Sequence, residues 1–180
     1  MPTTRQLAAL PLLALAALAA CVSPPPPAPA PAPPAPAPRP APPPPAPTYS
    51  NWMDAPQTPG DWYYIPEQGA SIAAFGPAQR QPWFALRCDM ATHAVSVGRT
   101  SASTVSQPMT IRTETATRTF AANPAQGSVE RLVATSLPAA DPFLDAMAFS
   151  RGRFAVEVTG EPTLYLPSWP EVTRVIEDCR

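Results

Sequence analysis

Apolar and polar residues alternate along several segments of the chain from about Gly60 onward. Phe84, Leu86 and Cys88 fall on one face of an extended segment, and Val95 and Val97 repeat the spacing in the next segment. A period of two places every second side chain on the same face of a strand, so that one face is buried and the other meets water. The pattern therefore predicts a strand over each segment.

The same kind of alternation predicts seven further strands. They cover residues 62–65, 72–75, 109–113, 117–121, 129–135, 154–159 and 164–166. Gly160, Glu161 and Pro162 are typical of a turn, so the last two strands are expected to form a hairpin. The predicted fold class is mainly β (α+β), with a small antiparallel sheet or sandwich.

Two segments have the period of a helix instead. Asp141 followed by Pro142 is typical of an N-cap and a first helical residue, and predicts a short helix near 141–148. A C-terminal helix is predicted near 169–178, where Ser168 and Glu171 match a capping box and Trp169 is expected to pack at the start of the helix. The apolar faces of the two helices contain Phe143, Leu144, Met147 and Ala148 in the first, and Val172, Val175, Ile176 and Cys179 in the second.

The N-terminal segment has a different character. Arg5 precedes an apolar stretch of 14 residues, 7–20, which is shorter than the roughly 20 residues needed to span a bilayer and is typical of a signal peptide. An ordinary secretory signal with a small-residue cleavage site is the alternative. The segment resembles the lipobox of bacterial lipoproteins, because it ends in Leu18, Ala19, Ala20 and Cys21.

This resemblance implies both an anchor and a location. In the lipoprotein family the chain is cleaved before the cysteine, which then carries a diacylglyceryl group, so residues 1–20 would be the signal peptide and 21–23 the lipidated N-terminus. Two or three acyl chains on Cys21 would hold the chain firmly, because each buried methylene contributes about 0.8 kcal/mol. Val22 after the cysteine implies, by the sorting tendency of such lipoproteins, the outer membrane and a domain that faces the periplasm.

A tract of proline and alanine follows the cysteine. Residues 24–47 contain 16 prolines, and Arg39 is the sole charge among them. Because proline restricts its own backbone and that of the preceding residue, the tract is expected to form a polyproline II spacer of roughly 75 Å at about 3.1 Å per residue. Docking of PxxP steps on a partner is the alternative. We assign residues 24–59 to this linker and 60–180 to one globular domain.

The cysteines allow a simple argument. If Cys21 carries lipid, Cys88 and Cys179 are left, and both are predicted to face inward in a compartment where disulfides persist. Their bond would close a loop of 91 positions and hold the last helix against the sheet. A redox pair is the alternative, but the two cysteines do not form a CxxC motif.

Charge and composition exclude several functions. Residues 48–180 carry 13 acidic residues and 10 arginines, a net charge of −3 that does not favour nucleic acid. The chain lacks lysine, which excludes a P-loop lysine, a lysine Schiff base and a Ser-Lys dyad. His93 is the sole histidine and the cysteines are not clustered, so no zinc site is expected. No cofactor is predicted. We expect His93 to be structural; a triad with Ser96 or Ser101 is the alternative.

Acidic residues near the two predicted helices have structural explanations. Asp141 and Asp145 are one turn apart and could hold a cation or act on a glycan, but an N-cap and the helix N-terminus explain their position. Glu177 and Asp178 are expected on a solvated face. No catalytic residue is predicted.

Two candidate binding surfaces remain. Arg151 and Arg153 flank Gly152 just before a predicted strand and could clamp an anion or a partner, whereas surface pairing with acidic residues is the alternative. A group of aromatic residues near the start of the domain could stack on sugar or fill the core, and consists of Trp52, Trp62, Tyr63 and Tyr64.

The domain also resembles other envelope proteins. Residues 141–180, with the segments SRGRF and LPSWPEVTRVIEDCR, look like those of uncharacterised bacterial envelope lipoproteins. Ser101, Ala102 and Ser103 are similar to the serine-containing loop of periplasmic lysozyme-inhibitor lipoproteins, although the glycine and aromatic residues beside that loop are missing here. We expect a non-catalytic envelope lipoprotein whose domain binds a protein or peptidoglycan; an enzyme inhibitor or an envelope hydrolase is the alternative.

Overall fold

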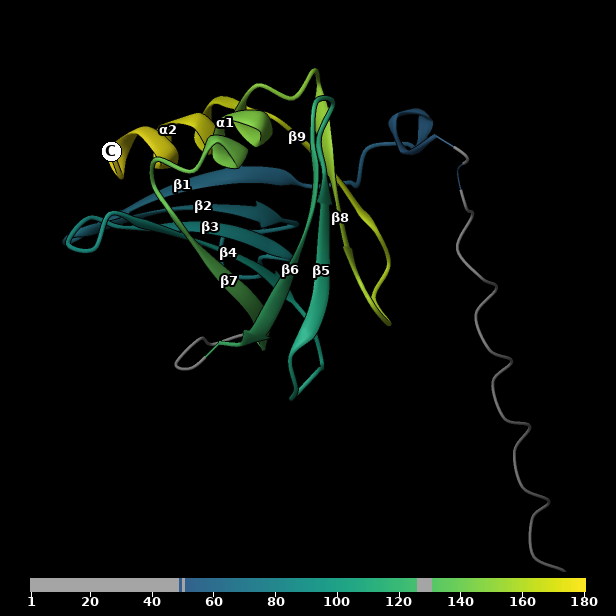
Figure 1. The fold of residues 1–180 in the computed structure, drawn as a ribbon, viewed down its shortest axis with the longest axis horizontal. Helices are drawn as coiled ribbons and strands as arrows, with labels where there is room; N and C mark the ends of the chain where they lie inside the picture. The colour runs from purple at the N-terminus through teal and green to yellow at the C-terminus, as the bar shows by residue number, and fades with distance from the viewer. Residues whose placement is uncertain (1–48, 50, 126–130) are drawn as a thin grey trace, which may run out of the picture. The chain divides into compact units, whose positions relative to one another are not determined.

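The computed structural model describes residues 49, 51–125 and 131–180. The apolar N-terminal segment, Cys21 and the proline-rich tract therefore lie outside the described residues. The domain is a nine-stranded sheet with two short α-helices and one 3-10 turn (Figure 1), which confirms the prediction of a mainly β fold. The elements are η1 (Trp52–Asp54), β1 (Asp61–Glu67), β2 (Ala70–Gly76), β3 (Phe84–Asp89), β4 (Ala94–Thr100), β5 (Gln107–Arg112), β6 (Thr117–Pro124), β7 (Leu132–Pro138), α1 (Pro142–Ala148), β8 (Arg153–Val158), β9 (Leu164–Pro167) and α2 (Pro170–Asp178).

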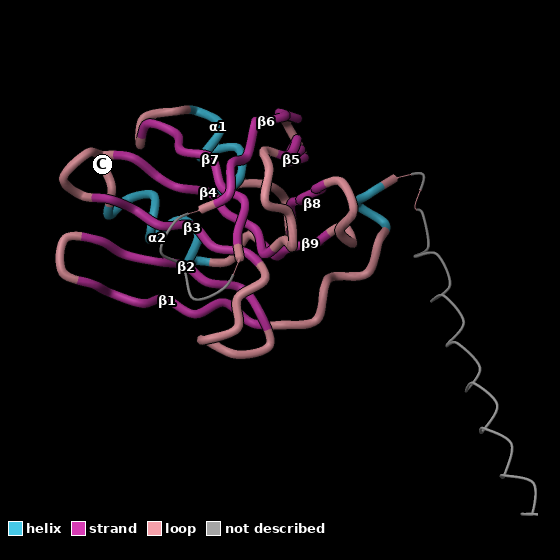
Figure 2. Tube along the Cα trace, turned by 90° about the horizontal axis from the view of Figure 1, so that it is seen from below, coloured by secondary structure: helices cyan, strands magenta, loops and turns pink. Residues whose placement is uncertain are grey.

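The strands form one curled antiparallel sheet in the order β1-β2-β3-β4-β7-β6-β5-β8-β9. Its shortest described pairing is between β6 and β7, which pair Asn123 with Ala134 and Pro124 with Val133 and continue in a hydrogen bond from the Ala125 amide to the Leu132 carbonyl at 2.9 Å. The sheet bends there, so that β5, β6, β8 and β9 turn away from the direction of β1–β4 (Figures 1 and 2). The bend places the inner faces of the two halves around a single core.

An aromatic contact joins the two ends of this curled sheet. Trp62 on β1 lies 6.1 Å from the ring of Phe84 on β3, and Phe84 lies 5.8 Å from Phe154 on β8. The indole N–H of Trp62 also donates to the carbonyl oxygen of Pro167 on β9, at 2.8 Å. Because Trp62 is 6% exposed and the two phenylalanines are fully buried, the first and last strands are held to the same core.

The helices cover one side of the sheet. α2 packs against β1, β2 and β3, and α1 lies beside α2 (Figure 1). α1 begins as predicted, because the side chain of Asp141 accepts a hydrogen bond from the Phe143 amide and Pro142 is the first helical residue. Phe143 then stacks edge-on against Phe120 of β6, with centroids 5.4 Å apart.

The predicted capping box of α2 is wrong. Trp169 is the N-cap residue and makes no side-chain capping bond, while the Ser168 hydroxyl donates to the Met147 carbonyl of α1 instead. Glu171 is left with one buried carboxylate oxygen that has no hydrogen-bond partner. The hydroxyl is used for a tertiary contact between the two helices, which the local sequence pattern does not reveal.

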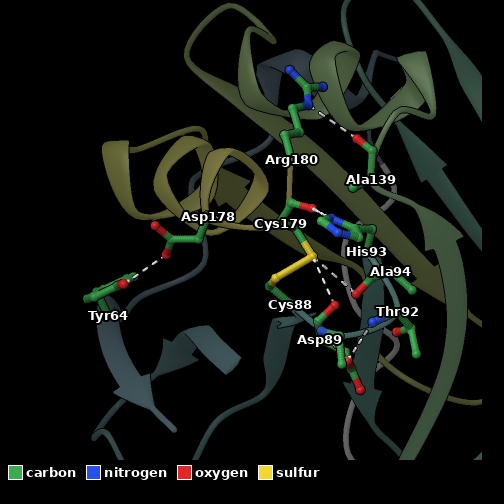
Figure 3. The surroundings of a disulfide bond; sticks show 11 residues. Tyr64, Cys88, Asp89, Thr92, His93, Ala94, Ala139, Asp178, Cys179 and Arg180 are labelled. Carbon is green, nitrogen blue, oxygen red and sulfur yellow. Dashed lines mark hydrogen bonds between the residues drawn. A yellow bond between two sulfur atoms is a disulfide. The ribbon is translucent and has the colours of Figure 1, made fainter. Parts of the chain in front are cut away.

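The last helix is also held by a covalent bond. Cys88 of β3 and Cys179, directly after α2, form a disulfide with Cα atoms 5.4 Å apart, and both are fully buried (Figure 3). This is the pairing expected from the sequence. Val172, Val175 and Ile176 line the same buried face of α2 as Cys179.

The residues directly before β1 pack against the domain, although the sequence analysis assigned them to the linker. Within the segment 51–59, which we assigned to the linker, Asn51 caps the turn η1 by accepting from the Met53 amide, and Ala55 is 1% exposed. Thr58 exchanges two hydrogen bonds with Tyr165 of β9, at 2.9 and 2.8 Å. The segment covers part of the β9 edge, which would otherwise have unpaired backbone groups.

Among the described helices, none has the length and apolar character required to cross a bilayer.

The disulfide gives a test of how α2 is held. In a Cys21→Ser background, replacing Cys88 and Cys179 with serine should lower the free energy of unfolding by about 2–4 kcal/mol, because the unfolded chain is no longer constrained by a long loop. Urea unfolding with and without a reductant measures this. The reductant should destabilise the parent chain and leave the serine variant unchanged; equal stability of the two chains without reductant would contradict the assignment.

Candidate functional site

The two arginines of the proposed anion clamp have separate intramolecular partners. Arg151 lies in the turn between α1 and β8, and its Nε is 3.5 Å from Glu114. Arg153 begins β8 and donates to the carbonyl oxygen of Ala55. Gly152 between them has φ of 79°, a left-handed conformation that glycine adopts without strain. Surface pairing therefore accounts for Arg151, and joint binding of an anion by both arginines stays a prediction.

Arg151 and Trp169 lie just beyond the paired ends of β8 and β9. The β8–β9 register pairs Arg153 with Pro167, and one step further the Ser168 amide donates to the Gly152 carbonyl at 3.3 Å. The next positions along the two segments are Arg151 and Trp169. The guanidinium of Arg151 is 87% exposed, and Trp169 is 39% exposed.

Phe149 is the C-cap residue of α1, and its amide donates to the Asp145 carbonyl at 2.9 Å. Phe149 is 72% exposed. Trp169 is the N-cap residue of α2, with an extended backbone and a side chain that is 39% exposed.

His93 has a structural role beside the disulfide. It lies in the turn between β3 and β4 with φ of 49°, and Nδ1 is 2.8 Å from the carbonyl oxygen of Cys179 (Figure 3). Its own carbonyl oxygen accepts from the Ala139 amide at 2.8 Å. Within the described part of the chain, neither Ser96 nor Ser101 is hydrogen-bonded to His93. The histidine thus connects the chain end to the turn before β4.

The turn that carries His93 is organised by Asp89. Its carboxylate accepts from the Ala91 and Thr92 amides, both at 3.0 Å. Hydrogen bonds from Thr92, through its backbone first and its side chain second, hold the pKa of Asp89 below its ordinary value. The Asp89 carboxylate therefore stabilises this turn by accepting hydrogen bonds from its backbone amides.

The carboxylates near the helices are engaged by different arginines. Arg118 donates to both oxygens of Asp141 at 2.8 and 2.9 Å, and Arg180 donates to Asp145 at 2.5 Å and to Glu177 at 3.2 Å. The hydrogen bond with Asp145 raises the pKa of Arg180 above its ordinary value. Asp141 and Asp145 are therefore each paired with a different arginine.

Across residues 49, 51–125 and 131–180, no group of three or more histidine, cysteine or acidic side chains is placed to hold a metal ion.

The aromatic group does not form a common surface. Trp62 is in the core, and the hydroxyl of Tyr64 donates to Asp178 of α2 at 2.8 Å. The guanidinium of Arg174 lies 3.7 Å from the ring centre of Tyr64, and thus covers the face on which a sugar would stack. Asp178, expected on a solvated face, in fact fixes α2 to β1.

One shallow hollow lies on the outer surface of β5 and β8 and has a volume of about 280 Å³. Glu157, its charged member, pairs with Arg112 at 2.9 Å. The hollow is lined by Pro108, Thr110, Glu157, Val158, Thr159 and Thr163. Hydroxyl groups and one neutralised carboxylate can form hydrogen bonds but do not make a nucleophile with an adjacent base.

The sequence interpretation missed Arg99, a buried cation. Arg99 on β4 is 3% exposed and donates to the carbonyl oxygens of Val156 on β8, at 2.8 Å, and of Pro162 after β8. Burial lowers the pKa of Arg99 to about 10, against the opposing effect of Glu161, so the guanidinium stays charged at neutral pH. It shares strand parity with Val95 and Val97, a pattern that could have revealed its inward position.

Comparison of the chain with protein-family models, with curated proteins and with solved structures found no match.

The role of Arg99 can be tested against an exposed arginine. Arg99→Ala should lower the free energy of unfolding by about 2–4 kcal/mol, because two carbonyl groups lose their donor and the buried side chain is removed. Arg87 pairs with Glu67 at 3.5 Å with both side chains nearly half exposed, so Arg87→Ala should cost less than about 1 kcal/mol. Urea unfolding compares the two; similar losses would refute the proposed role.

Proposed function

We propose that this chain is a lipid-anchored envelope protein whose domain binds an envelope protein or peptidoglycan without catalysing a reaction. The observation that carries the proposal is the order of three sequence features: a lipobox-like motif ending at Cys21, a proline-rich tract over 24–47, and one disulfide-bonded domain. A tether of this composition is semi-rigid and holds a domain away from its attachment point. The proposed location is the outer membrane, with the domain in the periplasm.

The arrangement of polar residues supports a binding function. His93 is bonded to the Cys179 carbonyl, and the carboxylates of Asp141 and Asp145 are bonded to arginines. General acid–base chemistry needs such groups within reach of a substrate and of one another. Each of them instead links two elements of the fold. This supports a domain that presents a surface to a partner.

The lysozyme-inhibitor alternative depends on the segment 101–103. Ser101 is 4% exposed, and its hydroxyl oxygen accepts from the Ser103 amide at 3.2 Å. The Ser103 hydroxyl donates to the Val105 carbonyl at 2.9 Å. Both serines thus stabilise the loop between β4 and β5, and this geometry does not favour inhibition over general partner binding.

The anchor is tested by Cys21→Ser. The wild-type chain should fractionate with membranes and yield an N-terminal peptide whose mass includes the acyl groups, whereas Cys21→Ser should be recovered in the soluble periplasmic fraction, because the thiol that carries the lipid is gone. The N-terminal peptide is identified by mass spectrometry. A wild-type chain that is soluble and unmodified at Cys21 would rule out the anchor.

Binding is tested by crosslinking in intact cells. Cells expressing the wild-type chain are crosslinked, and the chain is purified under denaturing conditions. We expect a specific envelope protein or peptidoglycan fragments to copurify, and to be lost when the tether carries an unrelated folded domain. Recovery of neither, or equal recovery with the unrelated domain, would overturn the binding proposal.

A further inference from the structure

The outer face of the neighbouring strands β6, β5 and β8 carries a row of polar side chains (Figure 1). Met109 and Ile111 of β5 are fully buried, so Thr110 between them points to the opposite face of the sheet. The antiparallel register places Thr110 directly opposite Thr119 of β6 and Glu157 of β8. These three side chains therefore lie side by side on one surface.

Direct contacts join the side chains of this row. The hydroxyl oxygens of Thr110 and Thr119 are 2.8 Å apart, and Arg112 donates to Glu157 at 2.9 Å. The shallow hollow of about 280 Å³ extends the row toward β9, because Thr163 lines it together with Thr110 and Glu157. We call this surface the threonine face, and it consists of Thr110, Thr119, Glu157, Thr159 and Thr163.

The chemistry of the threonine face suits a neutral ligand with many hydroxyl groups. Each threonine hydroxyl can donate one hydrogen bond and accept others. Glu157 accepts from Arg112 through both carboxylate oxygens, at 2.9 and 3.4 Å, and has lone pairs left for a ligand. Because the guanidinium balances the charge of Glu157, the face favours neither a cation nor an anion. A sugar meets these requirements, since it is uncharged and carries hydroxyl groups on adjacent carbon atoms.

The shape of the threonine face suits a long chain of sugars. The hollow has a volume of about 280 Å³, whereas sites that enclose a whole drug-sized ligand have roughly 300–1,000 Å³. Neighbouring strands lie about 4.8 Å apart, which is close to the length of one sugar unit in an extended β-1,4-linked chain. A glycan that runs across the strands can therefore present successive sugar units to successive side chains of the row.

We infer that the threonine face binds the glycan strand of peptidoglycan. This inference rests on the proposed function and specifies both its ligand class and the surface that binds it. Strands β5 and β8 are paired on both sides, so the face recognises a ligand through side chains and cannot add a partner strand. The proposed tether fits this ligand, because an extended tract of roughly 75 Å lets the domain reach the cell wall while Cys21 stays in the membrane.

The test is sedimentation of the full chain with purified peptidoglycan sacculi. The wild-type protein, extracted from membranes in mild detergent, should sediment with the sacculi. Glycan strands freed of their stem peptides, and a β-1,4-linked tetramer of N-acetylglucosamine, should both compete, because the proposed ligand is the sugar chain. Competition by free stem peptides but not by either glycan would overturn the inference.

A pair of matched variants locates the site. Thr110→Val combined with Thr163→Val removes two hydroxyl groups and keeps the shape of the side chains, and should weaken binding about tenfold, because two hydrogen bonds to the glycan are lost. Ser96→Ala combined with Ser136→Ala removes two paired hydroxyl groups from β4 and β7, outside the hollow, and should leave binding unchanged. Wild-type affinity in the threonine variant would overturn the inference.

A third variant tests whether the ligand is neutral. Glu157→Gln removes the charge and keeps a hydrogen-bond acceptor, so it should bind the sacculi almost as tightly as the wild type. If Glu157→Gln abolishes binding while the threonine variant retains it, the face recognises a positive charge, such as an amine of the stem peptide. That result would also overturn the inference.

The outcomes distinguish this inference from the proposed function. A wild-type chain that does not sediment with sacculi but crosslinks to a specific envelope protein in cells disproves glycan binding and leaves the binding proposal intact. A chain that neither sediments with sacculi nor crosslinks to a specific envelope component disproves both.

Discussion

The contact between Trp62, Phe84 and Phe154 is the interaction on which the rest of the fold depends. Among the described residues, the two halves of the nine-stranded sheet are joined by a short pairing between β6 and β7. Packing Phe84 between Trp62 and Phe154 brings β1 and β8 to one core, and the bond from Trp62 to the Pro167 carbonyl extends this to β9. The end strands are thereby held together by buried aromatic side chains, which contribute a large apolar area to the core.

The polar interactions are arranged around this core and mostly stabilise its edges. Arg99 links β4 to the carbonyls of β8 and the turn after it, across the interior. The disulfide and the His93–Cys179 bond fix the chain end next to β3 and β4. These groups are committed to contacts within the fold.

Local patterns predicted the elements well wherever one physical cause dominated. Alternation located all nine strands within a few residues, because a strand with one buried face must place apolar residues at every second position. Asp141 and Pro142 located α1, because a cap is a contact between residues close in sequence. The same reasoning failed at Ser168, where a tertiary acceptor on Met147 competes with the helix amides. The burial of Arg99 was not predicted, because a charged side chain was expected to be exposed to solvent.

The sequence by itself determined which segments become strands and helices, and left Cys88 and Cys179 as partners once Cys21 was assigned to lipid. The elements follow from the short-range periodicity of apolar residues, and the cysteine pairing follows from the number of cysteines. The tertiary structure decided the order of the strands, the closure of the sheet through Trp62 and the burial of Arg99. Each of these depends on residues far apart in the chain, whose contacts arise from packing around a common core and leave no local pattern in the sequence.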